Sequence, residues 1–193
     1  STFLINSAAH AWGSQPYSDA NSSRDNGFLA PLTFGEGYHN FHHMWQWDYR
    51  NAVNWYQWDP GKWIIFSLAG MGLAHGLRRV PDTVIRRARL AMEAKCLAAI
   101  LASAKPNLAE GLRDRLGAAK GRMDEALLAL QTRRDAWEVR KAEWRAKGQA
   151  RGAAWRMLRG EWKAERARGR RELHEAWMAW KAARMQVRGL GCT

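Results

Sequence analysis

The sequence predicts an all-α chain. Apolar side chains recur at helical spacing along most of its length, and glycines and prolines fall between these segments. The part after Asn107 is rich in Ala and Arg and carries a regular apolar stripe, which favours one long helix or a helical hairpin. The elements expected from these patterns follow in chain order.

Residues 1 to 12 have the pattern of the end of an apolar helix, and residues 13 to 22 that of a loop containing Gly, Pro, Ser and Asn. Ser22 or Ser23 can act as an N-cap, since an acidic residue follows within the first turn. We therefore expect a helix from this point to about residue 45, bent near Pro31.

Residues 45 to 61 are aromatic and rich in turn signals, and they end on the sequence "DPG". A helix is expected from Lys62 to about Leu77, either buried or lying at an interface. A further amphipathic helix is expected from Pro81 until Pro106 interrupts it.

The stripe after residue 107 has a strict period of seven, formed by Leu116, Met123, Leu130, Trp137 and Trp144. The positions three residues further on become basic at Arg133 and Arg140, which makes a weak seam for a two-stranded coiled coil. Trp155, Leu158 and Trp162 resume the stripe, followed by Leu173, Trp177 and Trp180. Any turn of a hairpin is expected at Gly148 and Gly152.

Charge divides the chain sharply. Residues 1 to 81 hold five basic and five acidic side chains, so the formal net charge of +13 lies entirely in residues 82 to 193. We predict two parts, residues 1–104 and a basic, Trp-rich helical tail over residues 105–193. The two cysteines match no disulfide or zinc pattern, which favours a reducing compartment.

The tail allows three interpretations. An Arg-rich helix carrying indoles can lie on an anionic membrane surface, and it can also pair with itself or with another chain. Its charge alone would attract phosphate, but no nucleic-acid-binding motif is present, so we expect no nucleic-acid partner. No segment is long enough to span a membrane unaided, because the apolar run after residue 62 ends at Arg78 after 15 residues.

Two short stretches carry candidate chemistry. In "GEGYHNFHH", His39, His42 and His43 stand at i, i+3 and i+4, which share one face of a helix. In "INSAAHAWG", Asn6 and His10 stand at i and i+4. Neutral imidazoles are good ligands for iron, zinc, copper or nickel, whereas a short motif of this kind can equally be a solvated polar face.

The two stretches together resemble the last part of membrane fatty acyl-CoA Δ9 desaturases, the stearoyl-CoA desaturase-like family. The intervening "SSRDN" and the following "DYRNAVNWYQWDPGKWIIFSLAGMGLAHGLRRVP" add to the likeness, the latter resembling the bacterial branch. The resemblance covers residues 1 to about 100. It departs from the family after the three-histidine box, where "MWQW" replaces an aromatic residue followed by proline.

The resemblance implies a site and a fold. His10, His39, His42 and His43 would ligate two iron ions, and Asn6 would reach one of them through a water. Thr2 and Phe3 would line the acyl tunnel. The all-α fold would comprise the end of the last transmembrane helix and cytosolic cap helices, followed by the tail. Catalysis would need no residues beyond the metal ligands. His75 and His174 match no motif and are expected to be ordinary side chains.

The family has two further histidine boxes that are absent here, so we expect a C-terminal fragment that is inactive alone. The implied reaction uses O2 and two electrons to insert a cis double bond, at Δ9 by the resemblance, into a saturated acyl chain carried most simply on CoA. Because the tail lacks a His-Pro-Gly-Gly haem signature, an electron donor in trans is implied. A bacterial inner membrane, with this portion on the cytoplasmic side, is the expected location.

Two alternatives remain open. The chain could be a non-catalytic desaturase remnant whose basic tail binds a membrane or a partner. It could also come from a related di-iron hydroxylase, although the "NSAAH" element favours a desaturase.

Overall fold

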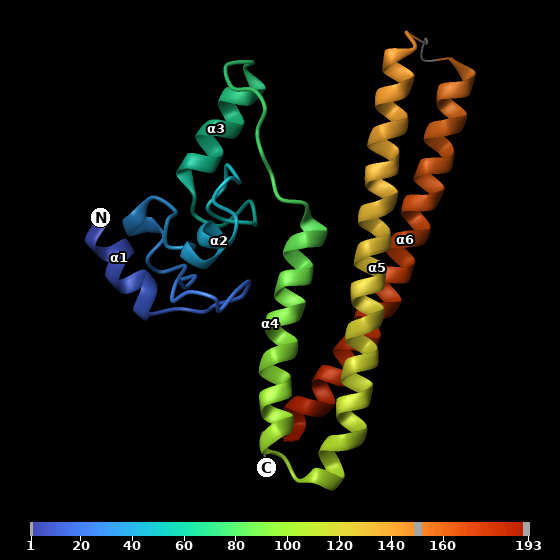
Figure 1. Cartoon of the computed structure of the whole chain (residues 1–193). Coiled ribbons are helices and arrows are strands. Elements are labelled where there is room, and N and C mark those ends of the chain that lie inside the picture. Colours follow the sequence, from blue (N-terminus) through green and yellow to red (C-terminus); the bar gives the residue numbers. More distant parts are fainter. Residues whose placement is uncertain (1, 149–151, 191–193) are drawn as a thin grey trace. The chain divides into compact units, whose positions relative to one another are not determined.

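The structure is a computed structural model that describes residues 2–148 and 152–190 (Figure 1). As predicted, the described chain is built from helices. It forms two compact units, residues 1–93 and 94–193. The elements are α1 (Thr2–Ala11), η1 (Pro31–Thr33), α2 (His39–Met44), α3 (Pro60–Gly70), α4 (Asp82–Ser103), α5 (Pro106–Ala146) and α6 (Ala153–Leu190).

The first unit begins as expected, with α1 ending at Ala11 and a loop after it. The predicted helix from residue 22 to residue 45 is wrong. Turns, the short 3-10 helix η1 and the six-residue α2 occupy this part of the chain. Asp25 forms isolated antiparallel bridges with Ser14 on one side and Tyr38 on the other, so this segment is extended at the point where a helix was expected.

Local side-chain chemistry explains the difference. The side-chain Oδ1 of Asn26 accepts the backbone N–H of Phe28 at 2.9 Å and that of Leu29 at 3.3 Å, which favours a turn over a helix. Phe34 and Gly35 both have positive φ, 54° and 100°, which ends η1. Gly37 lies so close to Ala30 that a Cβ atom at Gly37 would be 2.4 Å from the Ala30 nitrogen.

A small, mainly aromatic core packs around α2. Tyr17, Phe41 and Trp45 pack together with Val80 and Ile85, all of them buried. The ring centroids of Tyr17 and Trp45 are 5.2 Å apart, in an edge-to-face arrangement. This core joins the loop after α1, the helix α2 and the start of α4 within one unit.

A buried ion pair follows the core along the chain. Arg50 donates from Nε and Nη2 to the two carboxylate oxygens of Asp48, at 2.9 and 2.7 Å. Asp48 Oδ2 also accepts the backbone N–H of Val80 at 2.9 Å, which attaches the segment before α4 to the loop after α2. Because the two charges are joined by two hydrogen bonds and Asp48 accepts backbone N–H groups as well, the pair can remain charged although it is buried.

Helix α3 begins at the predicted "DPG", where Asp59 Oδ1 accepts the backbone N–H of Lys62 at 3.0 Å. It ends at Gly70, earlier than the predicted Leu77, because Gly72 and Gly76 adopt positive φ values of 76° and 66°. The helix was expected to be either buried or at an interface, and it is not buried. Its apolar side chains are largely exposed, among them Ile64 and Phe66.

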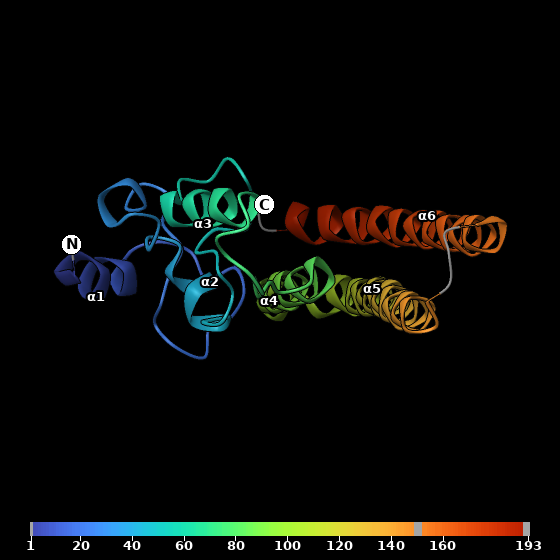
Figure 2. The ribbon, with the colours of Figure 1, turned by 90° about the horizontal axis from the view of Figure 1, so that it is seen from above.

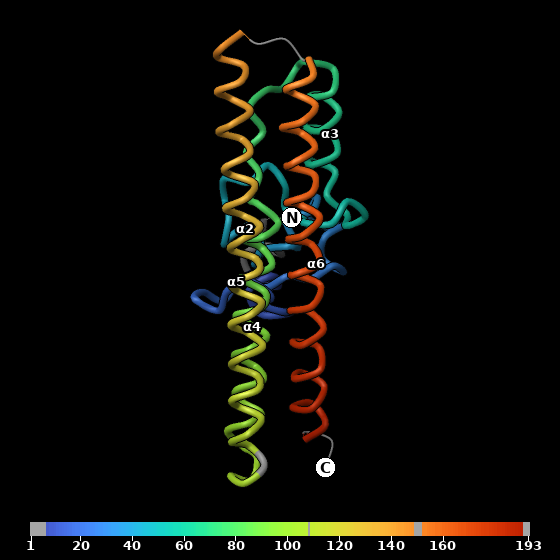
Figure 3. The backbone as a smooth tube through the Cα atoms, turned by 90° about the vertical axis from the view of Figure 1, so that its right-hand side faces the viewer, coloured from blue at the N-terminus to red at the C-terminus, as the bar shows by residue number. Residues whose placement is uncertain are grey.

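The long helices agree with the predicted hairpin. Helix α4 ends before Pro106, α5 runs for 41 residues and α6 for 38, and the two glycines predicted for the turn lie between α5 and α6. Figures 1, 2 and 3 all show α5 and α6 side by side and antiparallel. No helix within the described residues combines the length and the apolar character needed to cross a membrane.

The period-seven stripe of α5 faces α6. Trp137 is buried, and its ring stacks on that of Trp162 with centroids 4.8 Å apart. Arg133 and Arg140, the basic residues that interrupt the seam, pair across the hairpin with Glu172 and Glu165, at 2.7 and 3.4 Å. The predicted stripe fails at Trp177, which is 40% exposed, whereas Trp180 is fully buried.

Candidate metal centre

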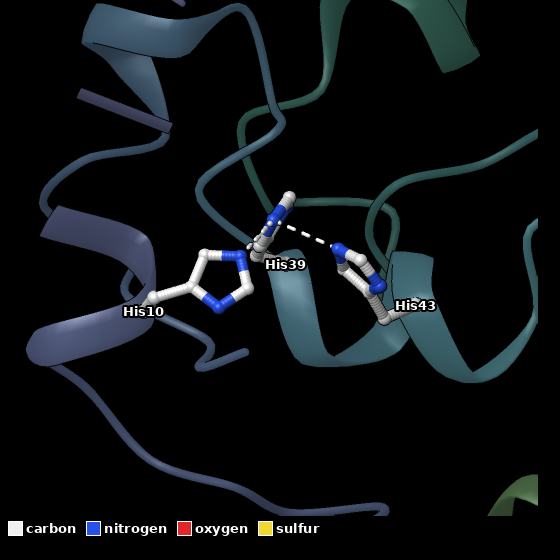
Figure 4. Close-up of side chains that lie close together, drawn as sticks. All are labelled: His10, His39 and His43. Carbon is white, nitrogen blue, oxygen red and sulfur yellow. Dashed lines mark hydrogen bonds between the residues drawn. The ribbon is translucent and has the colours of Figure 1, made fainter. Parts of the chain in front are cut away.

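Three of the predicted histidines meet at the junction of α1 and α2 (Figure 4). His10 lies in the last turn of α1, and His39 and His43 lie one turn apart on α2. The Nε2 atom of His39 is 3.1 Å from Nε2 of His10 and 3.0 Å from Nε2 of His43. Each of the three residues therefore offers a ring nitrogen to one point, and these nitrogens all lie within 4.8 Å of one another.

The "SSRDN" segment holds the two helices together. The backbone N–H of Arg24 donates to the carbonyl of Ala9 in α1 at 2.8 Å. The backbones of Ser14 and Asp25 exchange two hydrogen bonds, at 3.0 and 2.7 Å, and Asn26 N–H donates to the carbonyl of Gly37 just before α2. The segment is therefore a strap that fixes the end of His10's helix against the start of the helix that carries His39.

Gly13 makes this contact possible. Its φ of +133° lies in a region that favours glycine, and a Cβ atom there would be 2.5 Å from the carbonyl oxygen of Asp25. Any larger residue at this position would push the strap away from α1.

Asp25 caps the histidine helix from a distance in sequence. Its Oδ1 accepts the backbone N–H groups of Asn40 at 2.8 Å and Phe41 at 3.0 Å, which are unpaired donors of the first turn of α2. Burial raises the pKa of Asp25 to about 6, while the two N–H donors and Arg89 act in the opposite direction. The carboxyl group is thus desolvated and bonded to the first turn of the helix that carries His39.

The side chain of Asn40 holds the loop after α1 against α2. Its side-chain oxygen accepts the N–H groups of Tyr17 and Ser18, and its nitrogen donates to the carbonyls of Ser18 and Ser23 at 2.7 and 3.0 Å. The residue is only 1% exposed, and its amide is well satisfied. Because Asn40 directly follows His39, these bonds set the position of that imidazole.

The environment favours neutral imidazoles. Burial lowers the pKa of His39 to about 4, and the neighbouring rings of His43, His10 and His42 add to the effect. Burial, followed by the charges of His42 and His10, also lowers the pKa of His43. A neutral ring keeps a nitrogen lone pair available, which is the form that ligates a metal.

Hydrogen bonds alone satisfy this cluster poorly. Nδ1 of His10 lies 2.9 Å from the Ser22 hydroxyl, so a proton on Nδ1 leaves the Nε2 lone pair directed at His39. His39 Nε2 then faces two neighbouring nitrogens, and its buried Nδ1 has no hydrogen-bond partner among the described residues. A cation that accepts all three Nε2 lone pairs resolves the conflict.

The spacing also fits one ion. Two imidazole nitrogens bound at about 2.1 Å and at a right angle to each other lie about 3.0 Å apart. The two short Nε2 separations, 3.1 and 3.0 Å, match this value. Three neutral imidazoles suit iron, zinc, copper or nickel, and the geometry alone does not choose among these metals.

The remaining predicted residues lie elsewhere or outside the described side chains. His42 is next to the cluster, with its ring centroid 6.2 Å from that of His39, but its nitrogens do not join the three convergent ones. The side chains of Thr2, Phe3 and Asn6 lie outside the described part of the structure, so their predicted roles stay predictions. His75 and His174 are exposed, as ordinary side chains would be.

Sequence reasoning missed the residues that hold the ligands in place. Asp25 was expected only in the first turn of its own helix, and the positioning roles of Asn40 and Ser22 were not foreseen. A polar residue between two histidines is a weak signal, because nothing in the local pattern shows that its side chain is buried.

Comparison with known proteins agrees with the resemblance that the motifs indicate. The chain is 50% identical over 94 residues to acyl-CoA desaturase 1 of Saccharomyces cerevisiae, covering 49% of this chain and 18% of that protein. It is 44% identical over 96 residues to a probable acyl-CoA desaturase of Schizosaccharomyces pombe, covering 50% of this chain and 20% of the relative. About half of the chain is homologous to acyl-CoA desaturases.

A third relative, the acyl-CoA C20 Delta5-desaturase of Anemone leveillei, is 38% identical over 86 residues, covering 45% of this chain and 27% of that protein. The chain thus spans about a fifth to a quarter of the length of these three desaturases. No family model matches the chain. These relatives are fungal and plant proteins, so the resemblance to a bacterial branch stays a prediction.

Proposed function

We propose that the chain is the C-terminal part of a membrane fatty acyl-CoA desaturase that inserts a cis double bond into a saturated acyl chain. One observation carries the proposal. The histidines of the two desaturase-like motifs, 29 residues apart in sequence, converge at hydrogen-bonding distance in a chain of which half is up to 50% identical to acyl-CoA desaturases.

The proposed cofactor is a pair of iron ions. His10, His39 and His43 would hold one ion, and His42, whose ring lies beside the cluster, would serve the second together with ligands outside this chain. Asn6 would reach one of the ions through a water. When bound, the irons would supply the O2 chemistry that removes hydrogen from an unactivated methylene, which no side-chain acid or base can do.

The chain's own residues prepare this site. Ser22 holds the proton of His10 at Nδ1, which leaves Nε2 free as a ligand. Asp25 and Asn40 fix the first turn of α2, so that His39 and His43 present their nitrogens together. The desolvation that lowers the pKa of His39 keeps that ring neutral at neutral pH.

The proposed reaction takes one saturated acyl chain, one O2, two electrons and two protons to one cis-alkene and two waters. We place the double bond at Δ9 on the sequence resemblance, with Thr2 and Phe3 lining the acyl tunnel and so setting the position that is attacked. The names of the relatives support an acyl-CoA substrate. An electron-donor protein acting in trans and a membrane location, the bacterial inner membrane with this part on the cytoplasmic side, complete the proposal.

The test uses the complete coding region that contains this chain. Expressed in a yeast strain lacking its own acyl-CoA desaturase, it should produce monounsaturated fatty acids, mainly Δ9, measured as methyl esters by gas chromatography. Replacing His39 or His43 with Ala should abolish the product, whereas His75→Ala, an exposed control, should leave it unchanged. The 193-residue chain expressed alone should give no product.

Other products would redirect the assignment. Hydroxylated acids would identify a hydroxylase instead. An expressed protein that alters no fatty acid would contradict the proposal and leave a non-catalytic desaturase relative.

A further inference from the structure

The hairpin formed by α5 and α6 takes no part in the proposed function, since both histidine motifs lie before it in the chain. Its two helices differ in charge. Helix α5 carries nine basic and seven acidic side chains and is nearly balanced, whereas α6 carries ten basic side chains against four acidic ones. The positive charge of the hairpin therefore belongs mainly to α6.

Six cations of α6 share one face of the helix. Successive members are three or four residues apart, or three turns apart at the last step, which places them in a line about 38 Å long. His174 and Trp177 occupy the same face between the last two cations, and no acidic residue does. We call this line the basic stripe, formed by Arg156, Arg159, Lys163, Arg166, Arg170 and Lys181.

The acidic side chains of α6 lie on another side of the helix. Glu165 and Glu172 pair with Arg140 and Arg133 of α5, at 3.4 and 2.7 Å. Glu172 also lines a groove between the two helices, together with Arg122 of α5. The acids of this side are thus neutralised within the hairpin, and we call it the acidic side.

Nothing on the hairpin neutralises the basic stripe in the same way. All six side chains are exposed, and none of them forms an ion pair within the part of the chain that the structure describes. The guanidinium group of Arg166 lies over the ring of Trp162, 5.2 Å from its centroid. Like charges three or four residues apart repel each other on a helix, so an anionic surface facing the stripe removes a cost that the free hairpin bears.

Exposed apolar side chains accompany the C-terminal half of the stripe. Of the six tryptophans of the hairpin, five are buried or half-buried, whereas Trp177 is 40% exposed. Met178 and Met185, seven residues apart on the adjoining face, are 51% and 62% exposed. Indole and thioether groups beside cations are suited to the interface of a bilayer, where the charges meet headgroups and the apolar groups enter the acyl boundary.

Two other occupants of this face fit less well. Pairing with a second chain needs an apolar seam, and the seam of the hairpin is already filled, with Trp137 and Trp180 buried in it. The grooves of a DNA duplex wind about its axis, so a helix contacts bases over only a few residues, too short a length for the whole stripe. A bilayer surface is continuous and meets the whole stripe at once.

We propose that the basic stripe of α6 binds the anionic headgroups of a phospholipid bilayer, with Trp177 and Met185 entering the interface. This contact does not depend on iron or on the desaturase assignment. In a membrane enzyme it would be a second, peripheral attachment, which lipid charge and ionic strength control.

The test measures co-sedimentation of the full 193-residue chain with phosphatidylcholine vesicles, either pure or containing one-third phosphatidylglycerol. The readout is the ratio of the two affinities, because exposed apolar side chains of α3 can bind both kinds of vesicle alike. The parent chain should prefer the anionic vesicles about tenfold or more in about 0.1 M salt. It should lose most of this preference in about 1 M salt, which screens charges within about 3 Å.

A pair of double variants tests the stripe itself. Lys163→Gln with Arg170→Gln should reduce the preference about tenfold or more, because each Lys or Arg near an anionic bilayer contributes about fivefold. The matched control is Arg122→Gln with Arg168→Gln, which removes the same charge from the acidic side, where Arg168 stands four residues before Glu172. The control should change the preference by less than about threefold. Circular dichroism checks that both variants remain helical.

The remaining outcomes decide the proposal. A lower affinity of Trp177→Ala for anionic vesicles, with unchanged salt dependence, supports entry of the indole into the interface. The proposal is overturned if pure and anionic vesicles bind equally, or if the stripe variant and its control behave alike. It is also overturned if a DNA or RNA duplex binds more tightly than the anionic vesicles, which would assign the stripe to nucleic acid. None of these readouts needs iron or activity, so their failure is distinct from failure of the desaturase assignment.

Discussion

The Oδ1 atom of Asp25 accepts the backbone N–H of Asn40 at 2.8 Å, and this bond links the strap after α1 to the helix that carries three histidines. The Asn40 side chain in turn donates to the carbonyl of Ser23 at 3.0 Å, so the strap and α2 hold each other in both directions. The position of the histidine cluster therefore depends on residues that do not belong to it.

Removing the Asp25 cap should loosen the metal site. Asp25→Ala leaves two first-turn N–H groups without their acceptor, and we expect metal affinity to fall about 10- to 100-fold, as for other residues that orient ligands. Asp25→Asn retains an oxygen acceptor and should recover most of the affinity. Calorimetric titration with Fe²⁺ under anaerobic conditions measures both, and equal affinities for Asp25→Ala and the parent chain would refute the positioning role.

The metal-free chain should lose stability in acid because of His39. In the unfolded chain this residue takes up a proton near its ordinary pKa of 6.5, whereas in the folded chain it does so only near 4. The unfolded state therefore binds more protons between these values, and the free energy of unfolding falls as the pH is lowered from 6.5 to 4. His43, whose pKa is also lowered, acts in the same direction.

Asp25 acts in the opposite direction, because its folded pKa of about 6 lies above its ordinary 3.8, so its contribution is lost as the pH rises through 6. The effect of His39 is thus best measured in an Asp25→Asn background, by urea unfolding with a chelator present. There, adding His39→Gln should flatten the pH dependence between 6.5 and 4. An unchanged slope would show that His39 titrates normally in the folded chain.

Replacing two glycines of α6 with alanine should have different effects on the stability of the hairpin. A Cβ atom at Gly169 would lie 2.6 Å from Cδ2 of Leu130 and 2.4 Å from Nη1 of Arg133, whereas one at Gly160 would meet open space. Gly160→Ala should therefore stabilise the helix by about 0.5–1 kcal/mol. Gly169→Ala should give no such gain, because it displaces Arg133 from Glu172. Equal gains in thermal unfolding would contradict the packing described here.

Two tryptophans three residues apart should contribute differently to the free energy of unfolding. Trp180 is fully buried and Trp177 is 40% exposed. Trp180→Ala should cost about 3–5 kcal/mol of unfolding free energy, the range for truncating a buried aromatic residue. Trp177→Ala should cost about 1 kcal/mol or less. Chemical denaturation of the two variants measures the difference, and a reversed order would mean that α6 is rotated about its axis.

The sequence predicted the long helices well and the short ones poorly. The hairpin follows from a stripe repeated over many turns, and the turn from Gly148 and Gly152. The helix expected after Ser22 does not form. Its two signals, a serine that could act as an N-cap and an acidic residue close behind it, are local, and they do not show that Asp25 caps α2 instead. The early end of α3 at Gly70 was not predicted, because Gly72 and Gly76 lie within a continuous apolar run whose pattern favours a longer helix.

For the candidate site, the histidine motifs predicted the residues but not which of them lie together. The i, i+3, i+4 spacing places His39, His42 and His43 on one face, yet the nitrogens of His42 do not join those of His39 and His43, and His10 is the third member of the cluster. The partner that completes a cluster comes from tertiary contacts, here the strap between α1 and α2, which no local spacing reveals.

The most direct test of the account is an anaerobic titration of the 193-residue chain with Fe²⁺. Calorimetry measures the binding, and the metal content of the protein is determined after gel filtration. The account predicts one tightly bound ion per chain, lost in His10→Ala, His39→Ala and His43→Ala and retained in His75→Ala. Binding that is equally tight in the parent chain and in His39→Ala would contradict it, because the central nitrogen of the cluster would then play no part.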